Sequence, residues 1–288
     1  MTFEEREEIP RIPSWVKTAF DQGIEEAAFS SGAALSHLHH ILKDDRVPMA
    51  LLRDRLALKS AEAVMVSSGR PERSGELRDA VCLIKPGDLP GPAGDVFLTW
   101  RRAVEHRLSL NNLRRVFPYH DPVQLADWLD AGQGGPVSKV ACVLEINLDA
   151  HPKDDVTALL VSDVVLARAL GWDHLVPILA HGLKRADLRK RGDELKLACH
   201  RAAVSGCINA VYMAHDLARR AAHLKSVAPK LRAKKSGQAV EMFLTYDAVT
   251  AGALPLPDRS ARRLCDRLVD LGAVRELTGR DMFRIYGI

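Results

Sequence analysis

Apolar residues recur at intervals of three and four along most of the chain, which is the spacing of one face of an α-helix. In the segment 23–44, for example, Leu35, Leu38 and Leu42 follow this spacing. Helices are predicted by the same pattern for residues 23–44, 48–69, 95–107, 109–117, 121–130, 136–149, 154–170, 172–182 and 193–224, and for a shorter segment through Leu77 and Val81. We therefore predict a mainly α protein.

Two segments rich in breakers interrupt the helical pattern. Residues 85–94, KPGDLPGPAG, are dense in proline and glycine and predict a loop or linker. Residues 225–237, KSVAPKLRAKKSG, combine a helix-stopping proline, a run of lysines and a Ser-Gly pair, which is typical of a boundary between domains. We predict a multi-helix N-terminal domain over residues 1–228 and a small C-terminal domain over residues 236–288.

The C-terminal segment has its own succession of patterns. Short helices are predicted for residues 238–244 and 246–251, and a third begins at Asp258 with an apolar stripe and ends at Gly272. Residues 273–277 and 282–286 then alternate as two strands. A two-residue turn between them would place Arg275 opposite Arg284 in a β-hairpin.

Three short helices followed by a hairpin resemble a winged helix-turn-helix, a module found in several bacterial families. The resemblance implies that the third helix enters the major groove of DNA and that the hairpin, the wing, holds phosphates. The candidates for groove contacts are Arg259, Arg262 and Arg263, and those for wing contacts are Arg275, Arg280 and Arg284. Sequence-independent attraction to duplex DNA would come from Lys230, Arg232, Lys234 and Lys235.

Protein docking and a purely structural cap remain alternatives to DNA binding. Asp266 and Asp270 fall on the solvent side of the third helix, where they would repel phosphate, and residues 236–288 hold seven basic and seven acidic side chains. Two-fold symmetric binding to DNA would follow if the chain forms a homodimer.

The charge of the chain is unevenly distributed. The net charge is +4, yet residues 184–235 alone carry 14 Lys and Arg against 4 Asp and Glu. A basic block of this kind is either a solvated helix face or a surface for an anionic partner. Because the basic block lies next to the C-terminal segment, a surface for an anionic partner has to be considered.

Several classes of protein are disfavoured by the sequence. The start of the chain is acidic, unlike a secretory signal, and no apolar stretch approaches the roughly 20 residues of a membrane helix. The five cysteines include no CxxC pair, as in reduced thiols of a cytoplasmic protein. No phosphate-binding P-loop, GxSxG elbow or dinucleotide fingerprint is present, so no cofactor is predicted.

A helical enzyme or metal-binding protein is the rival hypothesis. His174, His200, His215 and Asp163 lie in the helical region and could converge on a pocket, where a carboxylate would orient an imidazole for proton transfer or metal binding. The sequence spacing does not establish that they meet. In this reading the C-terminal module would only dock a partner.

Over nearly its full length the chain resembles a bacterial family known as domain of unknown function 1403. The resemblance is carried by AAFSSGAALSHLHHIL, LLRDRLALKSAEA, KPGDLPGPAG, ARALGWDHLVPILAHGLKRADLR, APKLRAKKSGQAVEMFL and RSARRLCDRLVDLGAVRELTGRDMFRIYGI. It implies family membership and no particular chemistry. The functional expectation therefore rests on the residues above: a cytoplasmic regulator or accessory protein that binds duplex DNA.

Overall fold

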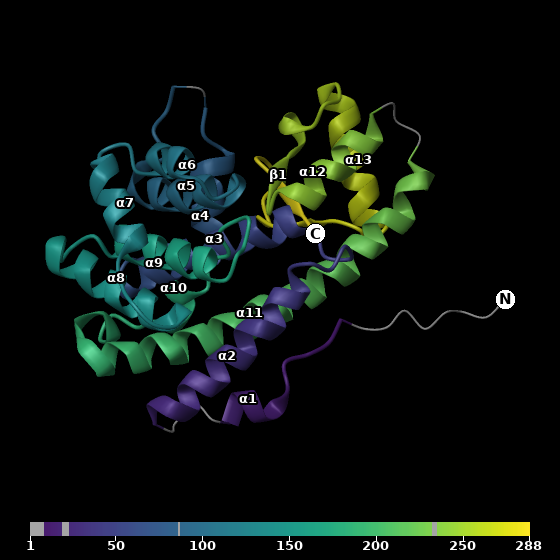
Figure 1. Ribbon diagram of the computed structural model, residues 1–288. Helices are drawn as coiled ribbons and strands as arrows, with labels where there is room; N and C mark the ends of the chain where they lie inside the picture. Colours follow the sequence, from purple (N-terminus) through teal and green to yellow (C-terminus); the bar gives the residue numbers. More distant parts are fainter. Residues whose placement is uncertain (1–8, 19–22, 86, 232–234) are drawn as a thin grey trace.

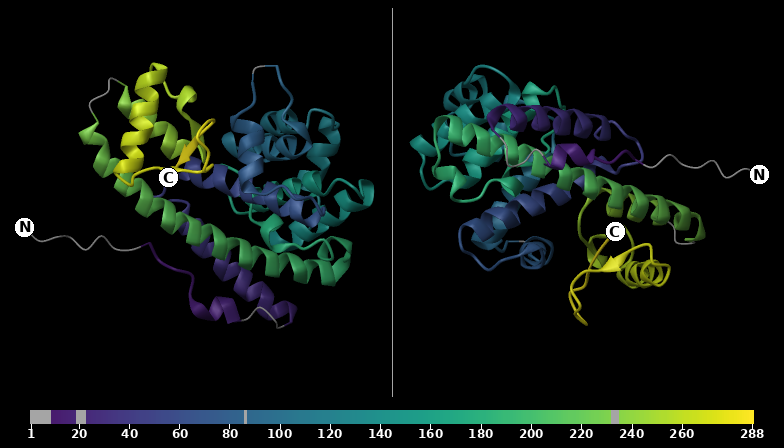
Figure 2. Two further views of the ribbon diagram at one scale, coloured as in Figure 1. Left: turned by 180° about the vertical axis from the view of Figure 1, so that it is seen from behind. Right: turned by 90° about the horizontal axis from the view of Figure 1, so that it is seen from below.

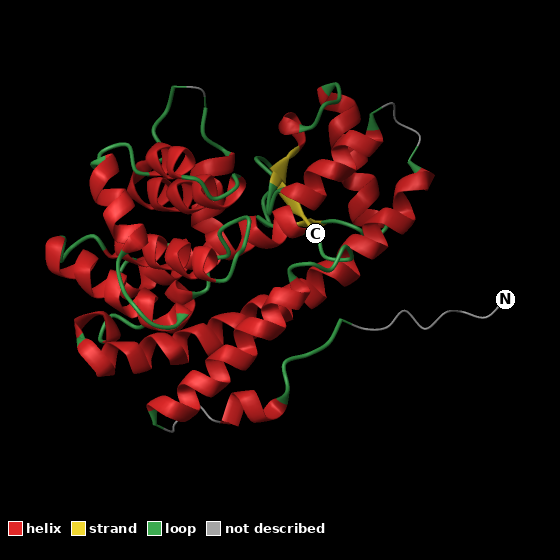
Figure 3. Cartoon of the chain, in the orientation of Figure 1, coloured by secondary structure: helices red, strands yellow, loops and turns green. Residues whose placement is uncertain are grey.

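The computed structural model describes residues 9–18, 23–85, 87–231 and 235–288 and is mainly helical, with a small sheet near the C-terminal end (Figure 3). The α-helices are α1 (Ser14–Thr18), α2 (Ile24–Ile41), α3 (Met49–Ser67), α4 (Ser74–Cys82), α5 (Gly91–Glu105), α6 (Leu110–Val116), α7 (Pro122–Asp130), α8 (Pro136–Ala150), α9 (Asp155–Ala169), α10 (Leu179–Gly182), α11 (Gly192–Val227), α12 (Ser236–Thr245) and α13 (Asp258–Asp270). Short 3-10 helices are η2 (Asp187–Arg189), η3 (Ala228–Lys230) and η4 (Ala251–Ala253), and the strands are β1 (Val249–Thr250), β2 (Arg275–Glu276) and β3 (Ile285–Gly287).

Most helices of the N-terminal part, hereafter the helical body (residues 9–231), agree with the periodic pattern. The loop predicted for residues 85–94 is too long, because α5 already begins at Gly91 with Pro92 in its first turn, where the missing N–H of proline costs nothing. The helix predicted for residues 172–182 is wrong. Only α10 is helical there, since Pro177 disfavours helical geometry before it and Asp163 accepts hydrogen bonds from the N–H groups of Ile178 and Leu179.

Helix α11 is the longest element, and its 36 residues correspond to roughly 54 Å at 1.5 Å per residue. It packs along α2 and also contacts α3, α8 and α10, and it then continues beneath the C-terminal segment (Figures 1 and 2). At Gly206 a Cβ atom would lie 2.2 Å from the main-chain oxygen of Ile178. Only glycine therefore lets the segment before α10 lie directly on α11.

The C-terminal module, residues 236–288, contains α12, α13 and a three-stranded antiparallel sheet in the order β1-β3-β2. The helix predicted for residues 246–251 is wrong: the chain instead forms β1 and the single turn η4. The reason is Asp247, whose main-chain N–H donates to Asp54 of α3 and whose carboxylate turns toward the helical body. These contacts hold the backbone extended just before β1.

The hairpin has a different register from the predicted one. Arg275 pairs with Gly287, Glu276 pairs with Tyr286, and the N–H of Leu277 donates to the main-chain oxygen of Ile285. Arg275 is therefore not opposite Arg284. The connection is a longer loop over residues 278–284, since the side chain of Glu276 accepts hydrogen bonds from the N–H groups of residues 278 and 279 and so turns the chain early.

A buried ion-pair cluster fixes the module on the helical body. The carboxylate of Asp247 accepts from Arg55 Nε at 2.6 Å and from Arg78 Nε at 2.5 Å, and only 2% of its side chain is exposed. Arg55 also donates to the main-chain oxygen of Ile288 at 2.9 Å. Asp54, the residue before Arg55 in α3, pairs with Arg101 at 3.0 Å. We call Asp54, Arg55, Arg78, Arg101 and Asp247 the anchor cluster.

The two carboxylates of the anchor cluster differ electrostatically. Burial alone would raise the pKa of Asp247, but the charges of Arg55 and Arg78 outweigh it and hold the pKa below its ordinary value. Burial raises the pKa of Asp54, and Arg101 offsets this only in part. Asp247 is thus the firmly ionised member of the cluster.

The apolar core is continuous between the helical body and the module. Buried side chains of α3 and α11 belong to the same cluster as Val240, Phe243 and Leu268 of the module. The module is therefore attached by both apolar packing and the anchor cluster. None of the helices in the described parts of the chain combines the length and apolar character that crossing a bilayer requires.

Candidate nucleic-acid interface

The first two turns of α13 present arginine side chains to solvent. Arg259, Arg262 and Arg263 are all exposed, whereas Ala261, Leu264, Cys265 and Leu268 on the other face are buried. Arg262 pairs with Asp258 at 2.8 Å, but both side chains remain about two-thirds exposed, at 70% and 67%. Within the described parts of the chain, Arg259 and Arg263 have no carboxylate at ion-pair distance.

The C-terminal half of α13 has the opposite character. Asp266 and Asp270 are exposed there, as the sequence predicts. The helix ends at Asp270 and is closed by Gly272, which is left-handed at φ +65°, and the N–H of Ala273 donates to the main-chain oxygen of Leu268 at 2.9 Å. A polyanion would therefore be attracted by the leading turns of α13 and repelled by its last turns.

The loop over residues 278–284 carries the other predicted contacts. Arg280 forms an ion pair with Asp79 of α4, so its charge is directed to the helical body. Arg284 is 43% exposed and lies 4.0 Å from Asp281. Two apolar side chains at the tip, Met282 and Phe283, are 68% and 65% exposed.

Arg275 does not lie at the tip of the hairpin. It lines a cavity of about 470 Å³ between α11 and the module, together with Arg219, Arg220 and His223. His223 Nε2 donates to the main-chain oxygen of Leu271 at 3.1 Å and so links α11 to the end of α13. Arg275 is thus a junction residue in the structure.

The lysines of the linker are only partly described. Lys230 ends η3 and Lys235 precedes α12, and both side chains are exposed. Arg232 and Lys234 lie outside the described residues.

The role of Arg55, Arg78 and Asp247, which set the orientation of the module, is not predicted from the sequence. The signal for them in the sequence is a carboxylate at position 247 within an otherwise apolar stretch.

The residues of the rival hypothesis have separate partners. His200 Nδ1 lies 2.7 Å from the hydroxyl of Ser31 on α2, and His215 Nε2 donates to the main-chain oxygen of Pro10 at 3.2 Å. The main chain of His174 forms an isolated antiparallel β-bridge with Arg107. Across the described residues, no three His, Cys, Asp or Glu side chains are grouped so that they could hold a metal ion.

Asp163 has a structural role that the sequence does not reveal. It is 1% exposed and accepts from the N–H groups of Ile178 and Leu179 at 3.1 and 3.2 Å. Burial raises its pKa to about 8, because the two hydrogen bonds only partly stabilise the charged form. Asp163 therefore holds the chain at the start of α10 and is mainly protonated at neutral pH.

Comparison with known proteins addresses the family of the chain. The family model described as "Protein of unknown function (DUF1403)" matches residues 1–288. The chain belongs to the DUF1403 family. This confirms the resemblance carried by the segments quoted above. Among curated proteins no match is found. The description of the DUF1403 family names no activity, so the placement of side chains has to carry any proposal of function.

Proposed function

We propose that this DUF1403 protein binds duplex DNA through its C-terminal module, with the leading turns of α13 in the major groove. The observation that carries the proposal is the exposed group Arg259, Arg262 and Arg263 at one end of a helix whose opposite face is buried. Guanidinium groups on an exposed helix suit both phosphate contacts and bidentate contacts to guanine.

The arrangement of the module supports the proposal. The elements α12, β1, α13, β2 and β3, with the sheet order β1-β3-β2, follow one another as the first helix, first strand, third helix and last two strands of a winged helix do. The module differs from a winged helix between β1 and α13, where the single turn η4 stands in place of the second of the three helices. The anchor cluster lies on the side of the module that faces α3 and α4, and the arginines of the first turns of α13 stay exposed to solvent.

A binding titration of labelled mixed-sequence duplexes at several salt concentrations tests this function. We expect log affinity to fall steeply with log salt, because each phosphate contact releases counterions and contributes about −0.9 to the slope. The double variant Arg259→Gln and Arg263→Gln should weaken binding and reduce the slope by about 2.

The matched control is Arg114→Gln with Arg115→Gln, two exposed arginines at the end of α6. It removes the same charge from the helical body and should leave affinity and slope almost unchanged. Equal losses in both variants would indicate nonspecific attraction to the whole surface. Undetectable binding of the unaltered protein at low salt would refute the proposal.

Protein docking by the module is the second candidate, favoured by one observation. Met282 and Phe283 are exposed at the tip of the loop, where Phe283 has a left-handed backbone at φ +58°, which is uncommon outside glycine. An apolar tip suits a protein surface, and it also suits insertion between base steps in the minor groove. Phe283→Ser should weaken duplex binding only in the second case.

A further inference from the structure

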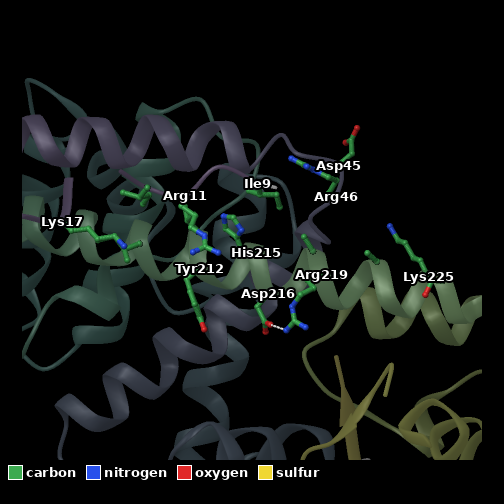
Figure 4. Close-up of a pocket in the computed structure, with 16 residues that line it drawn as sticks. Ile9, Arg11, Lys17, Asp45, Arg46, Tyr212, His215, Asp216, Arg219 and Lys225 are labelled. Atoms are coloured by element: carbon green, nitrogen blue, oxygen red, sulfur yellow. Dashed lines mark hydrogen bonds and ion pairs between the residues drawn. The ribbon is translucent and has the colours of Figure 1, made fainter. Parts of the chain in front are cut away.

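A long groove runs along α11 between this helix and the N-terminal segment (Figure 4). Its volume is about 1290 Å³, and it lies between α11 and the segment of residues 9–17. The floor consists of apolar and small side chains that recur along one face of α11: Ile208, Val211, Ala218 and Ala222. Ile9 and Ile12 of the segment form the facing wall.

The facing wall is fixed in place by hydrogen bonds and by packing. The main-chain oxygen of Pro10 accepts from His37 Nε2 at 2.9 Å and from His215 Nε2 at 3.2 Å, which ties the segment to α2 and α11 at once. Ile9 and Ile12 are each only 6% exposed. The groove is therefore formed before any ligand arrives, which reduces the ordering cost of binding.

The polar groups around the groove are mostly cationic. The charged ones are Arg11, Lys17, Arg46, Arg219 and Lys225, against the carboxylates of Asp45 and Asp216. Arg46 is already paired with Asp44 at 2.6 Å. Asp216 is already shared between Arg219 at 2.8 Å and Arg220 at 2.6 Å. Within the part of the chain that the structure describes, Arg11, Lys17 and Lys225 have no hydrogen-bond or ion-pair partner.

The side chain of Arg11 reaches across the groove. Figure 4 shows its side chain extending from the wall toward α11 beside His215, with Arg219 on the next turn of the helix. A ligand resting on Ala218 and Ala222 would thus meet cations on both sides of the apolar floor. Ligand sites are commonly concave and mainly apolar, with a small number of polar groups that fix orientation.

We propose that this groove binds a small organic anion with an apolar body. The apolar part, an acyl chain or aromatic system, lies on the α11 floor, and the carboxylate, sulfonate or phosphate group lies between Arg11 and Arg219. The excess of cations excludes cationic amphiphiles, and the apolar floor excludes fully hydrated anions such as inorganic phosphate. The site is separate from α13 and does not depend on DNA binding.

Fluorescence titration of the full chain with 8-anilinonaphthalene-1-sulfonate tests the proposal. This probe has an aromatic body and one sulfonate, and its neutral counterpart, N-phenyl-1-naphthylamine, lacks the sulfonate. We expect one probe per chain, with the anion bound at least about 10-fold more tightly than the neutral compound, as for a charge-assisted hydrogen bond. Equal affinities for the two probes would overturn the assignment of an anion site.

Two variants locate the bound probe. Arg11→Gln with Arg219→Gln should lower the affinity for the sulfonate by about 10-fold or more and leave the neutral compound unaffected. Ala222→Trp, at an exposed position of α11, should block both compounds by filling the groove. Circular dichroism would verify that each variant is folded.

The matched controls are the double variants at Arg114 and Arg115 and at Arg259 and Arg263, which should bind the sulfonate as the unaltered protein does. Loss of probe binding in these controls, or full retention in Ala222→Trp, would show that the probe binds elsewhere and would overturn the proposal. DNA titrations of the same variants separate the two sites: the groove variants should retain the duplex affinity that the α13 variant loses.

Discussion

Removing the charge of Asp247 should weaken the attachment of the C-terminal module to the helical body. Asp247→Asn keeps the size of the side chain but leaves Arg55 and Arg78 facing one neutral amide, whose NH₂ group can accept nothing from a guanidinium. Breaking a buried ion pair by neutralising one partner typically costs about 3 to 5 kcal/mol. The exposed fraction of the Asp247 side chain, 2%, places this pair in that class.

Hydrogen exchange of the main-chain amides is the most direct assay. A loss of about 3 to 5 kcal/mol in the free energy of opening corresponds to exchange faster by about 100-fold to several thousand-fold, since each 1.4 kcal/mol is a factor of about ten. We expect this acceleration in residues 236–288. Amides of α8 and α9, whose described residues form no hydrogen bond or ion pair with the anchor cluster, should exchange at their original rates.

Asp54→Asn is the matched comparison on the same cluster. Burial raises the pKa of Asp54, so its charge is less favourable from the start, and asparagine can still accept from the N–H of Asp247. Arg101, with 22% of its side chain exposed, can recover hydration. We expect a smaller loss, of about 1 to 2 kcal/mol. Equal effects of the two variants, or no change in either, would refute the electrostatic description of the anchor cluster.

The contribution of Asp247 also has a defined pH dependence. Its folded-state pKa lies below the unfolded value of about 3.9, so the stabilisation is fully present above that pH and is lost as the pH falls through the folded pKa. The unaltered module should therefore loosen in acid below about pH 4, whereas Asp247→Asn should lack this part of the acid transition.

Other substitutions test the packing and the buried carboxyl group. Leu268→Ala removes a fully buried side chain of α13 and should destabilise the module by about 2 to 5 kcal/mol in urea denaturation; an unchanged midpoint would show that the apolar stripe is misassigned. Asp163 has a pKa raised to about 8, so the unaltered protein should lose stability as the pH rises from about 4 to 8, and Asp163→Asn should abolish that slope in denaturation measured across this range. Gly206→Ala would place a Cβ atom 2.2 Å from the oxygen of Ile178 and should lower the melting temperature, whereas Gly32→Ala in α2, with open space at its Cβ, should leave it unchanged or raise it; the reverse order would contradict the close packing of α10 on α11.

Local patterns in the sequence predict most helices and the register of α13. The spacing of Ala261, Leu264 and Leu268 identifies the buried face of α13, and Gly272 correctly predicts its end. Such features depend on neighbours within one or two turns. Because the arginines lie off this face, their exposure could also be predicted.

Features that depend on distant partners could not be predicted. A helix is predicted from the sequence around Asp247, and the segment is extended instead because Arg55 and Arg78, far away in the sequence, bind its carboxylate. The hairpin register depends on Glu276, whose side chain turns the chain earlier than the Gly279 and Arg280 signal suggests. The groove on α11 is equally invisible in the sequence, since its walls come from opposite ends of the helical body.

The anchor cluster also constrains how sequences of this family can diverge. A relative that replaces the aspartate at position 247 would be left with two unneutralised guanidinium groups in a desolvated junction, so the arginines at positions 55 and 78 should be exchanged in the same lineage. We expect these three positions to covary as a unit across the DUF1403 family, while the exposed arginines of α13 vary independently of them. Each member of the family would then keep all three of these charged residues or none of them.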